Sequence, residues 1–241
     1  MGDERKQILH GRRRGRRLRP GRQALVDRLL PRISLDPGTL PADLRHCFGR
    51  PVRAVWLEIG FGGGEHLAAQ AAAHPDVGFI GCEPYINGVA RLLAEIDAAP
   101  DSRPLDNIRI LPDDARGLVE SVPAASLERV FVLFPDPWPK KRHHQRRFLA
   151  PAQLDLLARA MAPDAELRVA TDHQGYLRWI LQHCTGHSSF RWLARGPADW
   201  RHRPADWPQT RYEEKALDRG EDCVYLRFLR RDRMAPESAE S

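Results

Sequence analysis

The sequence lacks the patterns that mark several common classes of protein. No stretch approaches the ~18 to 20 apolar residues that a membrane-spanning helix needs, and no apolar segment follows the basic N-terminus as in a secretory signal. The four cysteines are widely separated and form no C-x-x-C pair, which argues against a disulfide framework or a zinc site. There is no G-x-S-x-G motif, and no H-x-x-x-H pair lies on a predicted helix. We therefore expect a cytoplasmic protein that binds no metal and uses no serine nucleophile.

The positive charge is concentrated in two blocks. Residues 1–22 carry a net charge of +7, and residues 140–147 (K-K-R-H-H-Q-R-R) carry +5, although the whole chain carries only +6. The remainder is therefore acidic. Such a distribution indicates a polyanion that is contacted at defined places. The alternative is a solvated basic arm with no partner, which is common at chain ends.

A glycine-rich segment predicts the ligand site. Residues 58–65 (E-I-G-F-G-G-G-E) directly follow the apolar run 54–57, as when a strand ends in a carboxylate and turns through glycines into a helix. A dinucleotide fingerprint would need glycine at position 65, where the chain has Glu65. That carboxylate would repel a pyrophosphate. The pattern suits a cationic, phosphate-free nucleoside such as S-adenosylmethionine, the alternative being a merely structural turn.

Beyond the glycines, apolar runs alternate with amphipathic segments. We predict an amphipathic helix over 23–35 that is closed by Pro31, followed by a mainly irregular segment up to Arg53. Strands are predicted at 54–59, 77–82, 107–111, 128–134, 165–170 and 223–229, with helices at 64–73, 86–98, 114–121, 151–161 and 173–183. The strands show no polar alternation, as expected in a parallel sheet that helices cover on both faces. We therefore expect a doubly wound α/β fold whose last strand runs antiparallel at the edge of the sheet, after an irregular stretch over 196–222.

In such a fold, ligands bind at the carboxyl ends of the strands. Acidic residues stand at successive predicted strand ends: Glu58, Glu83, the doublet Asp113-Asp114, and Asp172. Glu83 is placed to accept hydrogen bonds from ribose hydroxyls. Asp113 and Asp114 could hold an adenine edge, but helix capping explains either one equally well.

The fourth predicted strand ends in F-P-D-P-W-P-K-K, residues 134–141. Prolines on both sides of Asp136 restrict its backbone and that of its neighbours. A fixed carboxylate beside an aromatic plane and two lysines suits a flat, hydrogen-bonding base, although a structural proline-rich turn is the alternative. Spacing alone assigns no role to residues 210–215 (T-R-Y-E-E-K).

The sequence resembles the bacterial tRNA (guanine-N7-)-methyltransferase family. The resemblance rests on V-W-L-E-I-G-F-G-G-G-E-H (55–66), F-P-D-P-W-P-K-K-R-H (134–143), A-T-D (170–172) and T-R-Y-E (210–213). It extends from about residue 8 to residue 230, and the P-D-P-W string is its most specific part. The resemblance implies a class I, Rossmann-like methyltransferase fold with a mostly parallel seven-stranded sheet. It also implies methylation of guanosine N7 at position 46 in the tRNA variable loop, with S-adenosylmethionine converted to S-adenosylhomocysteine.

The resemblance also implies residue roles. The cofactor-binding positions would be Glu58, Gly60, Gly62, Glu83, Asp114 and Asp136, and Asp136 would also be the catalytic carboxylate. The substrate-contacting positions would be Lys140, Asp172, Thr210, Arg211, Tyr212 and Glu213. We expect a disordered basic arm over 1–22, a methyltransferase domain over 23–231 and a flexible tail over 232–241.

Two other functions stay open. The chain could be a class I methyltransferase for another RNA position or for protein, or a catalytically inactive RNA-binding module. The sequence leaves open whether the protein is a monomer or a homodimer.

Overall fold

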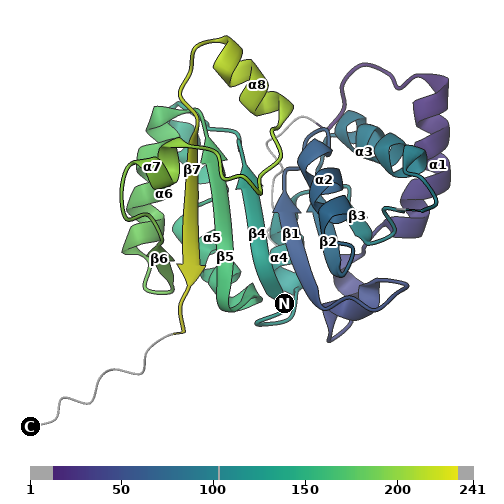
Figure 1. Ribbon diagram of the computed structural model, residues 1–241, viewed down its shortest axis with the longest axis horizontal. Coiled ribbons are helices and arrows are strands. Elements are labelled where there is room, and N and C mark those ends of the chain that lie inside the picture. Colours follow the sequence, from purple (N-terminus) through teal and green to yellow (C-terminus); the bar gives the residue numbers. More distant parts are fainter. Residues whose placement is uncertain (1–12, 103, 233–241) are drawn as a thin grey trace, which may run out of the picture.

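The computed structural model describes residues 13–102 and 104–232, and its centre is a seven-stranded sheet (Figure 1). The order of the strands is β3-β2-β1-β4-β5-β7-β6. Strands β1 to β5 are mutually parallel, whereas β7 is antiparallel to both β5 and β6. The strands are β1 (Ala54–Ile59), β2 (Val77–Cys82), β3 (Ile108–Leu111), β4 (Leu127–Leu133), β5 (Met161–Thr171), β6 (Phe190–Trp192) and β7 (Val224–Arg230).

Helices cover both faces of the sheet. They are α1 (Pro20–Ile33), α2 (Glu65–Ala73), α3 (Ile86–Ala98), α4 (Ala115–Ser121), α5 (Pro151–Ala160), α6 (Gln174–Gly186), α7 (Ala198–Arg201) and α8 (Arg211–Asp218). Short 3₁₀ turns are η1 (Pro37–Thr39), η2 (Leu44–Cys47) and η3 (Lys141–Arg146). In Figure 1 the β7 arrow points away from α8, and the parallel strands run in the opposite direction to β7. Helix α8 therefore lies above the carboxyl ends of the parallel strands.

Alternating side chains of the strands build two separate cores. In β1, Val55, Leu57 and Ile59 pack in the core that α4, α5 and α6 cover. Trp56 faces the other core, which α2 and α3 cover and against which α1 packs. All six residues of β1 are buried, as expected for a central parallel strand between two helical layers.

The sheet reverses its strand order at β1, which has β2 on one side and β4 on the other. The helices that follow β1 and β4 therefore leave toward opposite faces, and a crevice opens outside the carboxyl ends of these two strands. This topology places the glycine segment after β1 and the proline-rich segment after β4 next to each other.

The structure confirms the doubly wound fold that the sequence predicts, and the bounds predicted for β1, β2 and α3 coincide with those observed. The last strand is antiparallel, as predicted, but its placement at the edge was wrong. Strand β6 pairs with β7 and forms the edge instead. The stretch 196–222 is not irregular, because it contains α7 and α8.

The N-terminal boundaries also differ from those predicted. Helix α1 begins at Pro20 and continues through Pro31 to Ile33. Pro20 is favourable at the first position of the helix, because the backbone N–H that proline lacks would have no intrahelical partner there. The predicted arm boundary at residue 22 therefore falls inside α1. Residues 1–12 and 233–241 lie outside the described residues, so the disorder of the arm's first part and the flexibility of the tail stay predictions.

Residues 13–19 have no regular secondary structure but contact the start of α3. Gly15 N donates to Asn87 Oδ1 (3.0 Å), and Ile86 N donates to the carbonyl of Arg13 (3.1 Å). In the part of the chain that the structure describes, no helix is long and apolar enough to cross a membrane.

Candidate active site

The loop after β1 follows a left-handed path that glycine permits. Gly60, Gly62 and Gly64 have φ of 71°, 57° and 84°, values that are sterically unfavourable for residues with a Cβ. Gly64 is the N-cap of α2. The segment thus turns the chain within a few residues from the end of β1 into α2, with its backbone at the crevice.

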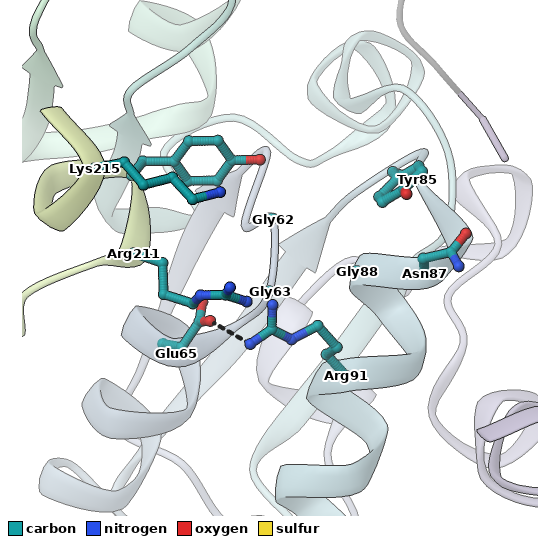
Figure 2. Close-up of a pocket in the computed structure, with 10 residues that line it drawn as sticks. Gly62, Gly63, Glu65, Tyr85, Asn87, Gly88, Arg91, Arg211 and Lys215 are labelled. Atoms are coloured by element: carbon teal, nitrogen blue, oxygen red, sulfur yellow. Dashed lines mark hydrogen bonds and ion pairs between the residues drawn. The ribbon is translucent and has the colours of Figure 1, made fainter. Parts of the chain in front are cut away.

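The glycine loop packs directly on the first turn of α3. A Cβ on Gly88 would lie 2.1 Å from the carbonyl oxygen of Gly62 (Figure 2). Only glycine fits there, because the atom it would strike belongs to the backbone. Gly88 therefore sets the distance between the loop and α3.

Glu83, at the end of β2, connects these two segments. Its Oε2 accepts a hydrogen bond from Gly62 N and its Oε1 accepts one from Tyr85 N, each 2.8 Å long. Burial raises the pKa of Glu83, the two backbone donors oppose this shift, and the neighbouring Asp136 adds to it. The carboxylate thus occupies a poorly hydrated, acidic environment, while each of its oxygens retains a further acceptor site.

Glu58, in contrast, points into the protein interior. It is 3% exposed, and its Oε2 lies 2.7 Å from Nδ1 of His66, which is itself buried on α2. This pair connects β1 to α2 across the glycine loop. Among the described residues, Glu58 does not line the cavities at the crevice, so its predicted contact with a cofactor stays a prediction.

The proline-rich segment after β4 has a constrained backbone. Phe134 and Trp138, on either side of Asp136, have φ of 49° and 43°, which is rare for aromatic residues and costs ~1 to 3 kcal/mol each. Phe134 N donates to the carbonyl of Ala170 on β5 (2.8 Å). Asp136 therefore lies between two strained residues, of which Phe134 is bonded to the sheet.

Arg147 also holds this segment, a role that the sequence analysis missed. It is only 3% exposed, its Nε donates to the carbonyl of Pro137 (2.8 Å), and its guanidinium lies 5.0 Å from the ring centres of Tyr176 and Trp179. The interpretation of 140–147 as one polyanion-contacting block was wrong at this residue. Lys140, Lys141 and Arg142 are exposed.

Two cavities meet at Asp136. The central cavity, about 350 Å³, lies between the glycine loop and the proline-rich segment and is lined by Ile59, Gly60, Gly62, Glu83, Pro84, Tyr85, Phe134, Pro135, Asp136 and Tyr212. The side cavity, about 140 Å³, continues from it toward α4 and adds Cys82, Asp114, Ala115, Arg116, Trp138, Arg146 and Phe148. Together they could hold an elongated nucleoside that has polar groups along its length.

Within the acidic doublet after β3, the structure distinguishes the two residues. Asp114 lines the side cavity and also caps α4, its Oδ1 accepting from Arg116 N (2.9 Å) and its Oδ2 pairing with the Arg116 guanidinium (2.6 Å). Asp113 pairs with Arg13 instead (2.8 Å). Of the two residues, Asp114 is therefore better placed to contact a ligand in the side cavity. It also caps α4, so the capping interpretation holds for it as well.

The four residues of the T-R-Y-E segment divide into two pairs. Thr210 caps α8, because its Oγ1 accepts from Glu213 N (3.2 Å). Glu213 is buried, where it accepts from Tyr225 Oη (2.6 Å) and pairs with Nε of Arg203 (3.0 Å). Arg211 and Tyr212 are exposed, and Tyr212 lines the central cavity.

The remaining predicted substrate positions lie around the same crevice. Asp172, after β5, pairs with Arg219 at the end of α8 (3.2 Å). Lys140 is exposed and precedes η3. The structure thus brings most of the predicted residues to one end of the sheet, and it gives three of them (Asp172, Thr210 and Glu213) partners that hold α8.

The central cavity favours a cationic ligand. Desolvation raises the pKa of Asp136, which is more exposed than Glu83. The pKa of Tyr212 is raised as well, first by desolvation and then by Glu83 and Asp136. A positive ligand between Glu83 and Asp136 would reduce the repulsion between the two carboxylates. In residues 13–102 and 104–232, no cluster of three or more His, Cys, Asp or Glu side chains could hold a metal ion.

The sheet order, the glycine loop and the acidic residues at the strand ends define a class I methyltransferase fold. Solved structures agree. The 16S rRNA methyltransferase KamB matches with a TM-score of 0.52 at 16% identity, over 75% of this chain and 89% of its own. The 16S rRNA (adenine(1408)-N(1))-methyltransferase from Catenulisporales acidiphilia also gives 0.52 at 16% identity, over 82% of this chain and 94% of its own. At such identities the likeness concerns the fold alone.

Sequence relatives define the family. A family model described as a putative methyltransferase matches residues 52–226. A tRNA (guanine-N(7)-)-methyltransferase from Rhodospirillum rubrum is 54% identical over 231 residues, 94% of this chain and 89% of the relative. The proteins of the same name from Chelativorans sp. and Brucella abortus are each 48% identical and cover 93% and 92% of this chain, and 95% and 94% of their own lengths. The chain belongs to the tRNA (guanine-N(7)-)-methyltransferase family, as its motifs predicted.

The contact between Gly88 and the glycine loop gives a first test. We expect Gly88→Ala to lower the free energy of unfolding by about 1 to 3 kcal/mol, as overpacking does, because the new Cβ must displace the Gly62 carbonyl. The matched control is Gly117→Ala on α4, whose Cβ would meet nothing within 4 Å and should stabilise by about 0.5 to 1 kcal/mol. Chemical denaturation of both variants measures the difference. If the two variants had equal free energies of unfolding, the loop would be able to move away from α3 without a loss of stability.

Proposed function

We propose that this protein methylates N7 of guanosine in tRNA, at position 46 of the variable loop, in the cytoplasm. The observation that carries the proposal is the position of Asp136. Its backbone lies between strained neighbours, and its side chain lies where the central and side cavities meet. The family relatives, all named for guanine N7 of tRNA, supply the substrate class.

The cavities fit S-adenosylmethionine, the cosubstrate named for a solved methyltransferase of the same fold. The spare acceptor sites of Glu83 would receive the ribose hydroxyls. Asp114, in the side cavity, would face the adenine edge, and the backbone of Gly60 and Gly62 would lie along the amino acid portion. When bound, S-adenosylmethionine supplies a methyl group on a sulfonium, which the lone pair of guanine N7 can attack without a general base.

Asp136 would orient the guanine and stabilise positive charge as it develops on the purine ring. Its carboxylate accepts hydrogen bonds from the N–H edge of the base. Holding reactants in line can supply about 7 to 11 kcal/mol of the barrier reduction, and the constrained backbone on both sides of Asp136 serves this purpose. Tyr212 lies beside Gly62 and would close the cavity over the base.

The target base must leave its stack to reach this site. N7 lies on the major-groove edge, which in A-form RNA is too deep and narrow for side chains to read. The guanosine must therefore be extruded or lie in a loop, where unstacking costs least. The exposed lysines after Trp138 would bind the surrounding phosphates.

The test is methyl transfer from labelled S-adenosylmethionine to an unmodified tRNA, followed by borohydride–aniline cleavage at 7-methylguanosine. Cleavage at a single guanosine in the variable loop would support the proposal in full. Methylation without cleavage would retain the methyltransferase and reject N7. Cofactor binding without methyl transfer to any tRNA would favour an inactive RNA-binding module.

For the catalytic role, we expect Asp136→Asn to lower kcat by about 10²- to 10³-fold, the usual cost of losing one electrostatic stabiliser. The affinity for tRNA should change much less, because the charge on the base develops only during transfer. Single-turnover rates and tRNA titrations measure the two effects. Asp164→Asn, an exposed carboxylate at the opposite end of β5, is the matched control. Equal losses of rate and affinity would make Asp136 a binding residue only.

The environment of Glu83 predicts a pH effect on cofactor binding. Burial raises its pKa in the free protein, whereas ribose hydroxyls and a cationic ligand would favour the ionised form and lower that pKa. Binding below neutral pH should therefore release protons, and affinity should fall as the pH decreases toward the raised pKa. Titration calorimetry in two buffers of different ionisation enthalpy, from pH 8 to pH 5.5, measures this release. Proton uptake, or none, would show that Glu83 does not contact the ligand.

The N-terminal arginines predict a salt effect. Replacing Arg12, Arg13, Arg14, Arg16 and Arg17 by Gln should weaken tRNA binding. The slope of log K against log salt should decrease by roughly 0.7 to 0.9 for each phosphate that the variant no longer neutralises. Arg191→Gln, an exposed position on the edge strand β6, is the control. A slope that matches the original protein would show that the arm does not touch RNA.

A further inference from the structure

A third hollow lies beside the central cavity. This hollow, the α3–α8 groove, has a volume of about 230 Å³ and runs between the first turns of α3 and the exposed side of α8 (Figure 2). Its charged side chains are Glu65 of α2, Arg91 of α3, and Arg211 and Lys215 of α8. None of these four residues lines the two cavities assigned above. The groove is therefore a separate feature with a net charge of +2.

The only ion pair drawn in Figure 2 among the residues that line the groove joins Glu65 to Arg91, at 3.0 Å. The figure shows the Arg211 guanidinium directed toward this pair, while Lys215 points toward the glycine loop from the next turn of α8. One carboxylate thus faces three cations. Two positive charges remain for which the groove itself offers no counterion.

Helix α8 is fixed so that these cations face the groove. Ala216 is fully buried, and Glu213 is anchored to Tyr225 and Arg203. Residues four positions apart lie on the same side of a helix, so Arg211 and Lys215 share one face, away from the buried residues. Holding two like charges together on one face costs free energy, which an anion between them would recover.

The surroundings of the groove are also basic. Asn87, which lines the groove, accepts from Gly15 N through Oδ1 and donates to the carbonyl of Arg16 through Nδ2 (2.8 Å). These bonds bring the segment 13–17 along the groove, and its arginines 14, 16 and 17 are exposed. A polyanion leaving the groove would meet further positive charge.

The groove adjoins the central cavity. Gly62, Tyr85 and Tyr212 line both, and a Cβ on Gly62 would lie 2.9 Å from the Tyr212 ring. The ring of Tyr212 therefore stands between the groove and the place where Asp136 would meet the base. A nucleotide whose base enters the central cavity past Tyr212 would leave its sugar–phosphate backbone at the groove.

We propose that the α3–α8 groove binds one phosphodiester of the tRNA next to the methylated guanosine, through Arg91, Arg211 and Lys215. This inference rests on the proposed function and adds a phosphate site to it. Guanidinium groups suit phosphate because they donate two parallel hydrogen bonds, and lysine adds a point charge. Glu65 acts as the counterion of Arg91 until the phosphate replaces it. The groove thus fixes the nucleotide by its backbone while the central cavity selects the base.

The first experiment uses Arg211→Gln, Lys215→Gln and the double variant, with Arg191→Gln as control. Each single change should weaken binding of unmodified tRNA roughly three- to tenfold. This is less than a buried charged hydrogen bond contributes, because solvent screens the charges of a partly exposed site. If both cations bind one phosphate, the double variant should lose less than the product of the two single effects. The affinity for S-adenosylmethionine without tRNA should not change, which distinguishes a phosphate from the cosubstrate carboxylate as the bound anion.

The second experiment neutralises the RNA instead of the protein. A tRNA with a single methylphosphonate on either side of the target guanosine lacks one phosphate charge. The original protein should bind one of the two tRNAs more weakly, by a factor at least as large as that of Lys215→Gln. The Lys215→Gln variant should discriminate less than the original protein between that tRNA and the unmodified tRNA, because it has lost one of the three cations that the phosphate would meet.

A third variant, Glu65→Gln, should raise the affinity for tRNA, which Arg211→Gln and Lys215→Gln lower. Glu65→Gln removes the counterion of Arg91 and raises the charge of the groove, so tRNA binding should become tighter, most clearly at low salt, where charges are screened least. Weaker binding in this variant, or methylphosphonate effects that persist unchanged in Lys215→Gln, would overturn the groove assignment. Methylation of guanine N7 by the original protein, measured in the same samples, separates the two proposals, because its absence would reject the proposed function itself.

Discussion

The geometry of the site depends on one buried carboxylate, Glu83. Its two oxygens accept hydrogen bonds from Gly62 N in the glycine loop and from Tyr85 N before α3, so the ends of β1 and β2 keep a fixed separation. Gly88 allows the close approach that these bonds require. Protonating or removing the carboxylate would leave at least one backbone N–H facing a donor or a void. The pKa of Glu83 is nevertheless raised by its burial, so the protein keeps an acid in an environment that disfavours its charge. A ligand that supplies hydroxyl donors and positive charge would correct this imbalance, so the environment of Glu83 favours such a ligand.

In the first turn of helix α8, some residues anchor the helix and their neighbours line the site. Glu213 points into the protein, where Tyr225 and Arg203 hold it, and Thr210 caps the helix. Arg211 and Tyr212 point outward to the groove and the central cavity. Because a helix turns by about 100° per residue, adjacent residues can serve these opposite purposes. Mutations at Thr210 or Glu213 would therefore displace Arg211 and Tyr212 from the groove and the cavity.

The sequence predicted the central part of the fold well, because the burial of a parallel strand on both faces leaves a continuous apolar run. The strands Ala54–Ile59 and Val77–Cys82 show this signal without ambiguity. Helix α8 was missed, although T-x-x-E at 210–213 is a capping-box pattern that marks a helix start. Here the glutamate turns inward to Tyr225 instead of closing the box, a tertiary contact that spacing cannot reveal. Strand β6 has only three residues, too few for any periodicity. The role of Arg147 was hidden for a related reason, since a run of basic residues does not show which of them folds back onto Pro137.

The opposite charges of the cavity and the groove can coexist only because the structure keeps them apart. Glu83 lies in a poorly hydrated pocket where salt screens little, whereas the exposed cations of the groove act through water, where the Debye length is about 8 Å at physiological ionic strength. The glycine loop and the Tyr212 ring stand between them. If the two regions were continuous, Arg211 would neutralise the carboxylates and both ligands would lose their complementary charge. Under the proposed function, the tRNA and the cationic nucleoside would bind side by side, each to a surface of opposite sign, and would meet at Asp136. This separation gives glycine at position 62 a second purpose besides its positive φ, because a Cβ there would lie 2.9 Å from the Tyr212 ring and push the ring away.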